Sequence, residues 1–335
     1  MNVVVSQIAD PLISGNQGLD RTSNEPQPVH EKAYGKTIIV GEHAVVYGAR
    51  AVAMPVFSVQ MHVDLLPHYA PKNREQSPLI RVTLGGRSVT SHLRGVVDEA
   101  FACLGIGPFD LDLDGHSSVL VGAGLGSSAS LCVVVLRAIA KSIGMELSRC
   151  DLATKANQLE KRFHGNPSGL DTAVVAWEEV INFQRGKFPT TVPIKSPIVG
   201  PWHFAVIDSG ARSSTLEMVQ LVAPYFRGSE GEKRLHLFDD LAQVVETGLA
   251  SGNVSMVTGA MDEVGSHLVS AGIVNGPLAD VIRVARECGA LAAKVTGAGG
   301  GGCALALLDP KKSSTQLASL KSRLGAHRVF DVELT

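Results

Sequence analysis

Apolar and polar positions in the first third of the chain alternate with the two-residue period of β-strands. Between residues 59 and 65 every odd-numbered position is apolar and every even-numbered position is polar, so one face of a strand would be buried. Further strands are predicted at 37–40, 51–56, 79–84 and 109–113. The strand at 79–84 would end at Gly85-Gly86, a dipeptide typical of turns.

A helical period replaces this alternation further along the chain. Helices are predicted over 91–104, 127–143, 151–164, 214–226, 233–250, 254–270 and 277–288, with another after Asp309-Pro310. The later strands are predicted at 203–207, 290–296, 303–308 and 327–334. Because strands and helices are mixed in both halves, the pattern predicts the α+β class.

Composition narrows the function classes. The chain has 335 residues, 45% of them hydrophobic and 19% charged, enough for one large domain or two with a sizeable core. A formal net charge of -2 and 5% aromatic residues argue against nucleic-acid binding. Five scattered cysteines without CxxC spacing predict reduced thiols rather than disulfides or a zinc site.

Neither a membrane nor a secretion segment is predicted. The longest uncharged run, residues 115–136, is rich in Gly and Ser and is too polar to span a bilayer. No basic start followed by an apolar stretch marks a signal peptide, so a cytoplasmic location is expected. Residues 1–30 are polar and weakly patterned and are interpreted as a loose N-terminal arm.

A first glycine cluster lies between an extended stretch and a predicted helix. It reads Gly122-Ala123-Gly124-Leu125-Gly126-Ser127-Ser128. Glycines allow close approach of backbone N–H groups to an anion, and the free N–H groups of the helix start favour negative charge. The cluster is no Walker A loop, because no Lys follows the last Gly, and Ser127 rules out a dinucleotide fingerprint. It predicts a phosphate cradle, with a plain strand-to-helix turn as the alternative.

A second cluster, Thr296-Gly297-Ala298 followed by four glycines, matches G-x-G-x-x-G. A dinucleotide site is rejected, because a strand and not a helix follows and no acid lies about 20 residues beyond. We expect a tight loop that closes on a ligand. A flexible hairpin is the alternative.

Two further segments carry candidate side chains. Glu160 and His164 lie one helical turn apart on one face, and Asp171 begins the next element after a Gly-Asn-Pro turn. Taken singly, Asp171 could cap a helix and Glu160 could be a solvated charge. In the fourth segment, residues 35–48, Lys36 and His43 flank a short apolar strand. By default these two are a surface charge and a structural histidine.

Together the four segments, in this order, resemble the GHMP kinases, small-molecule kinases that phosphorylate galactose, homoserine, mevalonate and phosphomevalonate. The resemblance covers roughly residues 33–335. The segments Glu42–Gly48 and His164–Asp171 are most similar to the branch of the family that acts on mevalonate. Two departures are visible: Leu120-Val121 replaces a usual proline before the first glycine loop, and Glu178-Glu179 replaces a common Gly-Gly.

The resemblance implies an architecture and an activity. The N-terminal domain would be residues 31–198, with the fold of ribosomal protein S5 domain 2 and a left-handed βαβ unit. The C-terminal domain would be residues 199–335, with a ferredoxin-like fold, and the active site would lie between the two. The implied reaction is ATP- and Mg²⁺-dependent phosphorylation of the C5 hydroxyl of (R)-mevalonate, a step of isoprenoid and sterol precursor synthesis. A homodimer is compatible with the resemblance, which does not fix the oligomeric state.

The resemblance also implies residue roles. Asp171 would be the base for the C5 hydroxyl, with Lys36 beside it. Ser128 and Glu160 would hold Mg²⁺, and residues 122–128 would cradle the phosphates of ATP. The residues expected to bind or border the substrate are Lys36, Glu42, His43, Asp171, Thr215, Thr296 and Gly297. The alternatives are a sibling kinase for phosphomevalonate or a sugar, and a catalytically silent sensor of ATP and ligand.

Overall fold

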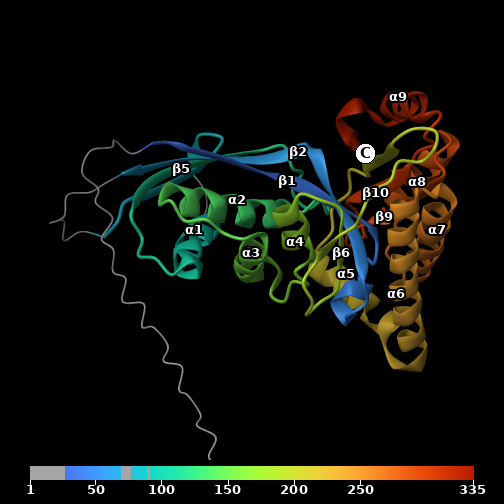
Figure 1. Ribbon diagram of the computed structural model, residues 1–335, viewed down its shortest axis with the longest axis horizontal. Coiled ribbons are helices and arrows are strands. Elements are labelled where there is room, and N and C mark those ends of the chain that lie inside the picture. Colours follow the sequence, from blue (N-terminus) through green and yellow to red (C-terminus); the bar gives the residue numbers. More distant parts are fainter. Residues whose placement is uncertain (1–26, 69–76, 89–90) are drawn as a thin grey trace, which may run out of the picture.

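The computed structural model describes residues 27–68, 77–88 and 91–335, which form two β-sheets side by side, each packed against helices (Figure 1). The predicted loose arm, residues 1–30, lies outside the described residues as far as residue 26. Its last two positions, Val29 and His30, instead begin the first strand. None of the helices in the described ranges combines the length and apolar character needed to cross a membrane.

The first sheet is built around two long strands. Its strands are β1 (Val29–Val40), β2 (Ala51–His68), β3 (Ile80–Leu84), β4 (Arg87–Ser88), β5 (Asp110–Ser117), β6 (Ile181–Phe183) and β7 (Thr190–Thr191). The order is β4-β3-β5-β2-β6-β7, and β1 pairs with β2. Strands β3 and β5 run parallel and are joined by helix α1 (Ser91–Leu104), which makes a βαβ unit.

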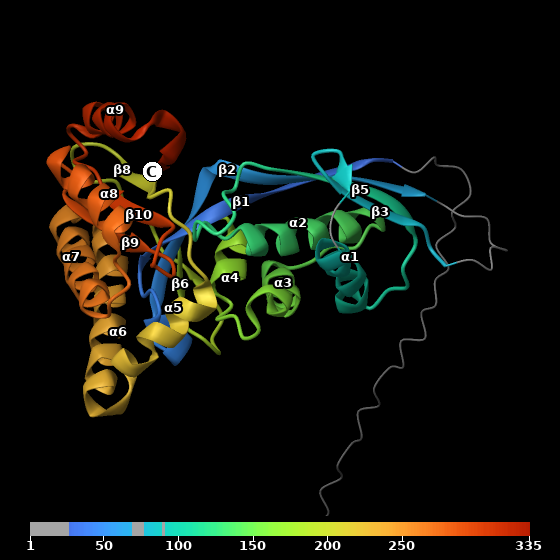
Figure 2. The ribbon, with the colours of Figure 1, turned by 180° about the vertical axis from the view of Figure 1, so that it is seen from behind.

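Three further helices lie with α1 along one face of this sheet: α2 (Ser127–Ser142), α3 (Arg149–His164) and α4 (Leu170–Trp177) (Figures 1 and 2). The run Val133-Val134-Val135 is poor helix material, yet it lies in the middle of α2. All three side chains are buried between the sheet and the neighbouring helices, so burial overrides the weak helix propensity.

The second sheet contains β8 (Trp202–Asp208), β9 (Ala292–Thr296), β10 (Cys303–Leu307) and β11 (Val329–Leu334) in the order β11-β8-β10-β9, with antiparallel neighbours. This is the order of a ferredoxin-like fold. Its helices are α5 (Thr215–Val222), α6 (Gly228–Ser251), α7 (Val254–Ser270), α8 (Gly276–Glu287) and α9 (Ser313–Leu324). The α+β prediction is confirmed. Short 3₁₀ turns are η1 (Ala44–Tyr47), η2 (Ala223–Phe226) and η3 (Ala326–Arg328).

A single apolar core crosses from one sheet to the other. Its buried side chains run from Val29 on β1 to Leu334 on β11, and a smaller cluster lies between the second sheet and helices α8 and α9. The predicted domain boundary between residues 198 and 199 falls in the connection from β7 to β8. All five cysteines are free thiols, as the sequence predicted.

Several elements differ from their sequence predictions. The strand predicted at 37–40 begins at Val29, and the helix predicted over 214–226 ends at Val222 and is followed by the 3₁₀ turn η2. The short strands β4, β6 and β7 were not predicted. The strands expected at 51–56 and 59–65 form the single strand β2. Its alternation breaks at Phe57 and Ser58, which are both exposed, because the register with β1 shifts between Tyr34 and Gly35. A bulge of this kind bends a strand without ending it.

Candidate active site

The first glycine loop connects β5 to helix α2 and is tied to strand β1. Gly122, Gly124 and Gly126 have φ values of +71°, +78° and +76°, which side chains with a Cβ rarely adopt. Gly126 is the N-cap of α2, so the positive end of the helix dipole lies at this loop. The backbone N–H of Lys36 donates to the carbonyl of Leu125 at 3.0 Å. Strand, loop and helix start are therefore held together.

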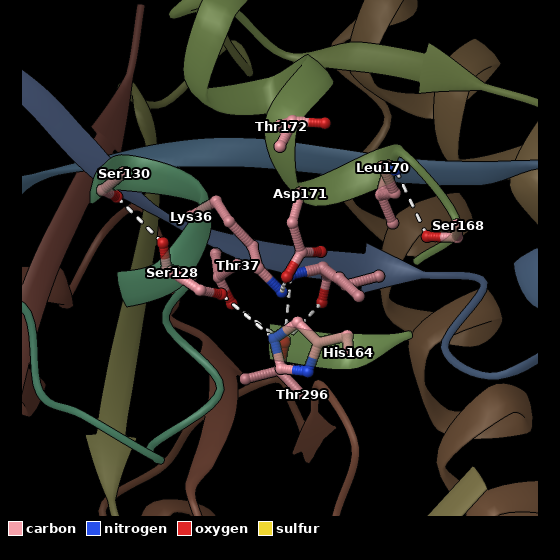
Figure 3. Close-up of polar contacts among 12 residues, drawn as sticks. Lys36, Thr37, Ser128, Ser130, His164, Ser168, Leu170, Asp171, Thr172 and Thr296 are labelled. Carbon is pink, nitrogen blue, oxygen red and sulfur yellow. Dashed lines mark hydrogen bonds and ion pairs between the residues drawn. The ribbon is translucent and has the colours of Figure 1, made fainter. Parts of the chain in front are cut away.

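Lys36 and Asp171 form an ion pair at this loop. Lys36 Nζ lies 2.9 Å from Asp171 Oδ2, and Figure 3 shows the two side chains pointing toward each other from β1 and α4. Lys36 is buried and is not the surface charge of the default interpretation. Asp171 lies in the first turn of α4, but the N-cap is Gly169. Its carboxylate is therefore not the helix cap that the sequence left open.

Glu160, Ser128 and His164 form a second group beside this pair. Ser128 Oγ lies 3.1 Å from Glu160 Oε1 and 3.0 Å from His164 Nε2 (Figure 3 shows the contact with His164). Glu160 is only 2% exposed, which excludes a solvated charge. Burial, and secondly the negative charge of Asp171, raise the pKa of Glu160 to about 8. Burial also lowers the pKa of His164.

The second glycine loop, residues 297–302, packs against the first. A Cβ on Gly297 would lie 3.4 Å from Gly124 Cα. The carbonyl of Gly302 accepts from the N–H of Ser209 at 2.9 Å, and the carbonyl of Gly300 accepts from the Asn275 side chain at 2.7 Å. A loop anchored on both sides in this way is no flexible hairpin.

Three of the seven residues expected to bind or border the substrate, His43, Thr296 and Gly297, lie around this loop. Thr296 Oγ1 contacts Thr37 Oγ1 at 3.0 Å, and Gly297 follows it directly. His43 Nε2 lies 2.9 Å from the carbonyl oxygen of Ala298. Burial lowers the pKa of His43, whereas this carbonyl contact acts in the opposite direction.

Glu42 and Thr215 are placed differently from the other expected substrate residues. The Glu42 carboxylate is fully buried in an ion pair with Lys294. Thr215 is exposed at the start of α5, whereas Ser213, two residues earlier, donates to the carbonyl of Gly299 at 2.5 Å.

Three side chains of the site received no role from the sequence: His164, Lys294 and Arg212. The spacing of His164 from Glu160 already placed both on one face, and the resemblance already paired Ser128 with Glu160, but nothing in the sequence pointed to the contact between Ser128 and His164. Arg212 forms two hydrogen bonds with Asp208, at 2.7 and 3.0 Å, and its Nε donates to the carbonyl of Val121 at 3.2 Å. It thus links the end of β8 to the entry of the first glycine loop, where the family's proline is absent.

The Glu178-Glu179 departure is accommodated by two arginines. Glu178 has a φ of +57°, a conformation that favours glycine. Arg137 of α2 contacts its carboxylate at 2.5 Å, and Arg149 contacts Glu179 at 3.1 Å. These ion pairs hold a turn for which the usual family members employ glycine.

The donor set at Glu160 and Ser128 suits a hard divalent cation. Among the described residues no group of three His, Cys, Asp or Glu side chains could hold a metal ion. One buried carboxylate and one hydroxyl are few ligands, but Mg²⁺ keeps several waters and binds through one or two carboxylates plus substrate phosphates. The raised pKa of Glu160 is a further sign of fit, because a cation would compensate the buried carboxylate.

Comparison with known proteins identifies related sequences. Family models of the N-terminal domain and the C-terminal domain of GHMP kinases match residues 91–179 and 247–326, together half of the chain. A mevalonate kinase of Pyrococcus furiosus is 28% identical over 310 residues, covering 85% of this chain and 91% of that protein. A mevalonate kinase of Aeropyrum pernix is 29% identical over 299 residues, covering 86% and 91%.

Solved structures share the fold at lower identity. The mevalonate kinase of L. major in complex with R-mevalonate superposes with a TM-score of 0.76 at 19% identity, covering 91% of this chain and 94% of that chain. The galactokinase of Lactococcus lactis complexed with galactose gives a TM-score of 0.73 at 14% identity, covering 92% and 94%. The phosphomevalonate kinase of Streptococcus pneumoniae gives 0.71 at 16%, covering 92% and 99%.

Proposed function

The chain belongs to the GHMP kinase family, and from this premise we propose that it transfers the γ-phosphoryl group of ATP to the C5 hydroxyl of (R)-mevalonate. The observation that carries the proposal is the Lys36–Asp171 pair, which lies beside the glycine loop at the start of α2. Phosphoryl transfer needs a positioned hydroxyl, a base and charge neutralisation more than covalent chemistry. The groups gathered at this site would meet these requirements.

The choice of mevalonate as the acceptor rests on sequence similarity and not on the fold. Structures with this fold include kinases named for mevalonate, phosphomevalonate and galactose, so the fold leaves the acceptor open. The full-length sequence relatives at 28–29% identity are named mevalonate kinases. The segments Glu42–Gly48 and His164–Asp171 point to the same branch.

In the proposed reaction Asp171 accepts the proton of the C5 hydroxyl as that oxygen attacks the phosphorus. Lys36 Nζ, 2.9 Å from the carboxylate, holds the base in place and stabilises the negative charge that develops on the attacking oxygen. Because Lys36 is buried, its charge is poorly screened by water and acts strongly on a hydroxyl bound beside it. Asp171 is partly exposed, so an acceptor can reach it from solvent.

The phosphates of ATP would lie on residues 122–128. The left-handed glycines bring the backbone close to the ligand, and the start of α2 favours its negative charge. Arg212, anchored by Asp208, would hold the entry of this loop at Val121. We propose that His43, Thr296 and Gly297 line the acceptor side, where the second glycine loop meets β1.

Ser128 and Glu160 would hold Mg²⁺. The ion would neutralise charge on the phosphate oxygens of ATP when bound. His164, which contacts Ser128 Oγ at 3.0 Å, would orient that hydroxyl. We propose that the enzyme is cytoplasmic.

A coupled assay of ADP release with an acceptor panel tests the function. We expect turnover with (R)-mevalonate and ATP in the presence of Mg²⁺. Equal or faster turnover of phosphomevalonate, galactose or homoserine would show that (R)-mevalonate is not the preferred acceptor. ATP and mevalonate binding without ADP release from any acceptor would indicate a silent sensor.

A further inference from the structure

A row of polar contacts joins the end of β1 to β9 across the two sheets. We call it the β1–β9 seam, and it consists of the pairs Ile38–Thr296, Glu42–Lys294 and His43–Ala298. Lys294 and Thr296 are alternate residues of β9 and share one face of that strand, and Ala298 follows in the loop after Gly297, which has a φ of +80°. The second glycine loop begins inside this row.

Glu42 and Lys294 are the only charged pair of the seam, and both side chains are 0% exposed. Lys294 Nζ also donates to the carbonyl of Val295 at 3.0 Å. Glu42 Oε1 bonds to Lys294, whereas Glu42 Oε2 has no hydrogen-bond partner within the described part of the chain. Burial raises the pKa of Glu42 and lowers that of Lys294, so each charge depends on the other.

A pair of this kind is a poor device for stability. Removing two charges from water is expensive, and the penalty is repaid only when geometry is excellent and the remaining lone pairs are satisfied. Here one carboxylate oxygen is left without a partner. Apolar side chains of similar volume would fill the space at no greater cost. What an ion pair adds is a fixed register between the two segments that carry it.

That register matters because of what the segments lead to. Lys294 lies three residues before Gly297, the residue whose Cβ position is 3.4 Å from Gly124 of the first glycine loop. Glu42 lies just beyond β1, the strand that carries Lys36. The pair therefore fixes the second glycine loop relative to the strand that presents Lys36 to Asp171.

We propose that Lys294 is a positioning residue for the acceptor site, which acts through Glu42 to fix the 297–302 loop and His43 against β1. The Glu42 carboxylate has no exposed surface, so it supports the acceptor site from beneath and does not contact the substrate. The inference rests on the proposed function for the identity of the acceptor, (R)-mevalonate.

The decisive variant is the double replacement Glu42→Met and Lys294→Met, which removes both charges and keeps two unbranched side chains. We expect a melting temperature equal to or above that of the wild type, since apolar replacement of a buried pair is often neutral or stabilising. We expect the KM and the calorimetric Kd for mevalonate to rise about tenfold or more, because small misplacements of a site are costly. The Kd for ADP should change by less than about twofold, because the first glycine loop keeps its own anchors.

Arg50→Met is the matched control. Arg50 binds Asp239 of α6 at 2.7 Å and also joins the two halves, but it lies outside the seam. Its loss should lower the melting temperature and leave the mevalonate KM unchanged. An equal rise in KM for Arg50→Met would assign the effect to general loosening between the halves and overturn the inference.

A double variant with wild-type KM and Kd for mevalonate would also overturn it. If the double variant does not fold, Glu42→Asp decides the matter. It keeps both charges but shortens the side chain by one methylene, which draws the carboxylate away from Lys294, and it should also raise the mevalonate KM. If the wild type phosphorylates another acceptor of the panel, the proposed function fails, and the same comparisons made with that acceptor decide the positioning role separately.

Discussion

Lys36 Nζ lies 2.9 Å from Asp171 Oδ2, although Lys36 belongs to the first strand and Asp171 to the fourth helix. The contact places a carboxylate beside the glycine loop, because the backbone of Lys36 is itself bonded to that loop at Leu125. One residue thus connects the base to the phosphate cradle. The chemistry of the site can be tested through this relationship.

Asp171→Asn should abolish most turnover without abolishing binding. The amide keeps the shape of the side chain but cannot accept the proton, and general-base catalysis is worth about 10²–10⁴-fold in rate. Lys36→Met should also lower kcat. The double variant should be little worse than the poorer single variant, since both act on one proton transfer. Measurements of kcat and of ligand Kd values separate catalysis from binding.

Asp151→Asn serves as the control for the base. Asp151 also lies in the first turn of a helix, α3, but it is exposed and bonds to Ser148. It should retain wild-type kcat. Near-normal turnover of Asp171→Asn would eliminate the base, and loss of both binding and stability would make its role structural.

Glu160→Gln should raise the Mg²⁺ concentration needed for half-maximal activity and lower kcat. The amide oxygen is a weaker ligand for a hard cation than a carboxylate. A Mg²⁺ titration of activity, with circular dichroism to verify the fold, measures the effect. Unchanged Mg²⁺ dependence would remove Glu160 from the proposed metal site.

The same residue predicts a pH dependence of stability without metal. The pKa of Glu160 is raised from about 4.5 to about 8, so the folded protein binds this proton more tightly than the unfolded chain. Its contribution to stability is full below about 4.5 and is lost as the pH rises toward about 8. Glu160→Gln should therefore become more stable relative to wild type as the pH rises. Melting temperatures between pH 5.5 and 9 should diverge, and parallel curves would contradict the shift.

Gly124→Val should abolish nucleotide binding. Gly124 has a φ of +78°, which a β-branched residue resists, and its added side chain would enter the space between the two glycine loops. Gly86→Val is the control, because Gly86 has a φ of +72° in a turn of the first sheet with open space around it. Calorimetry with ADP should distinguish them, and normal affinity in a folded Gly124→Val would exclude the cradle.

Arg212→Met should raise the KM for ATP and destabilise the protein most at neutral pH. Burial alone would raise the pKa of Asp208, but hydrogen bonds from Arg212 and the Gly210 backbone hold it below its usual value. Stability from a depressed carboxyl pKa is present above its unfolded value and lost as the pH falls. The stability difference from wild type should therefore shrink in acid. A stability difference between Arg212→Met and the wild type that does not change with pH would contradict this role of Arg212.

Local patterns predicted most of the elements. The helices over 91–104 and 254–270 match their predicted bounds, because an apolar stripe every three to four residues must face a core. The glycine loops were equally visible in the sequence, whereas the strand predicted at 37–40 begins at Val29 and includes Lys36. Glu160, Ser128 and Asp171 do gather, as the resemblance implied, and Gly169 rather than Asp171 caps α4.

The sequence patterns could not predict the long-range contacts. The partner of Glu42 is Lys294, near the opposite end of the chain, and no local period connects them. The role of Arg212 depends on the position of Val121, which only the packing of the two sheets determines. Strand β2 continues through Phe57 and Ser58, where a bulge interrupts the pairing with β1. A bulge breaks the two-residue alternation, so the sequence pattern predicted two strands.

The ion pair between Glu42 and Lys294 also has a consequence for the order in which the chain folds during its synthesis. Domains generally fold as units, the N-terminal one first, while the chain emerges from the ribosome. Lys294 is translated 252 residues after Glu42. Until then a carboxylate destined for the interior has no counter-charge. Nascent or truncated chains that end before β9 should therefore keep the end of β1 accessible to proteases and chaperones, and catalytic competence should arise only after β9 has been translated.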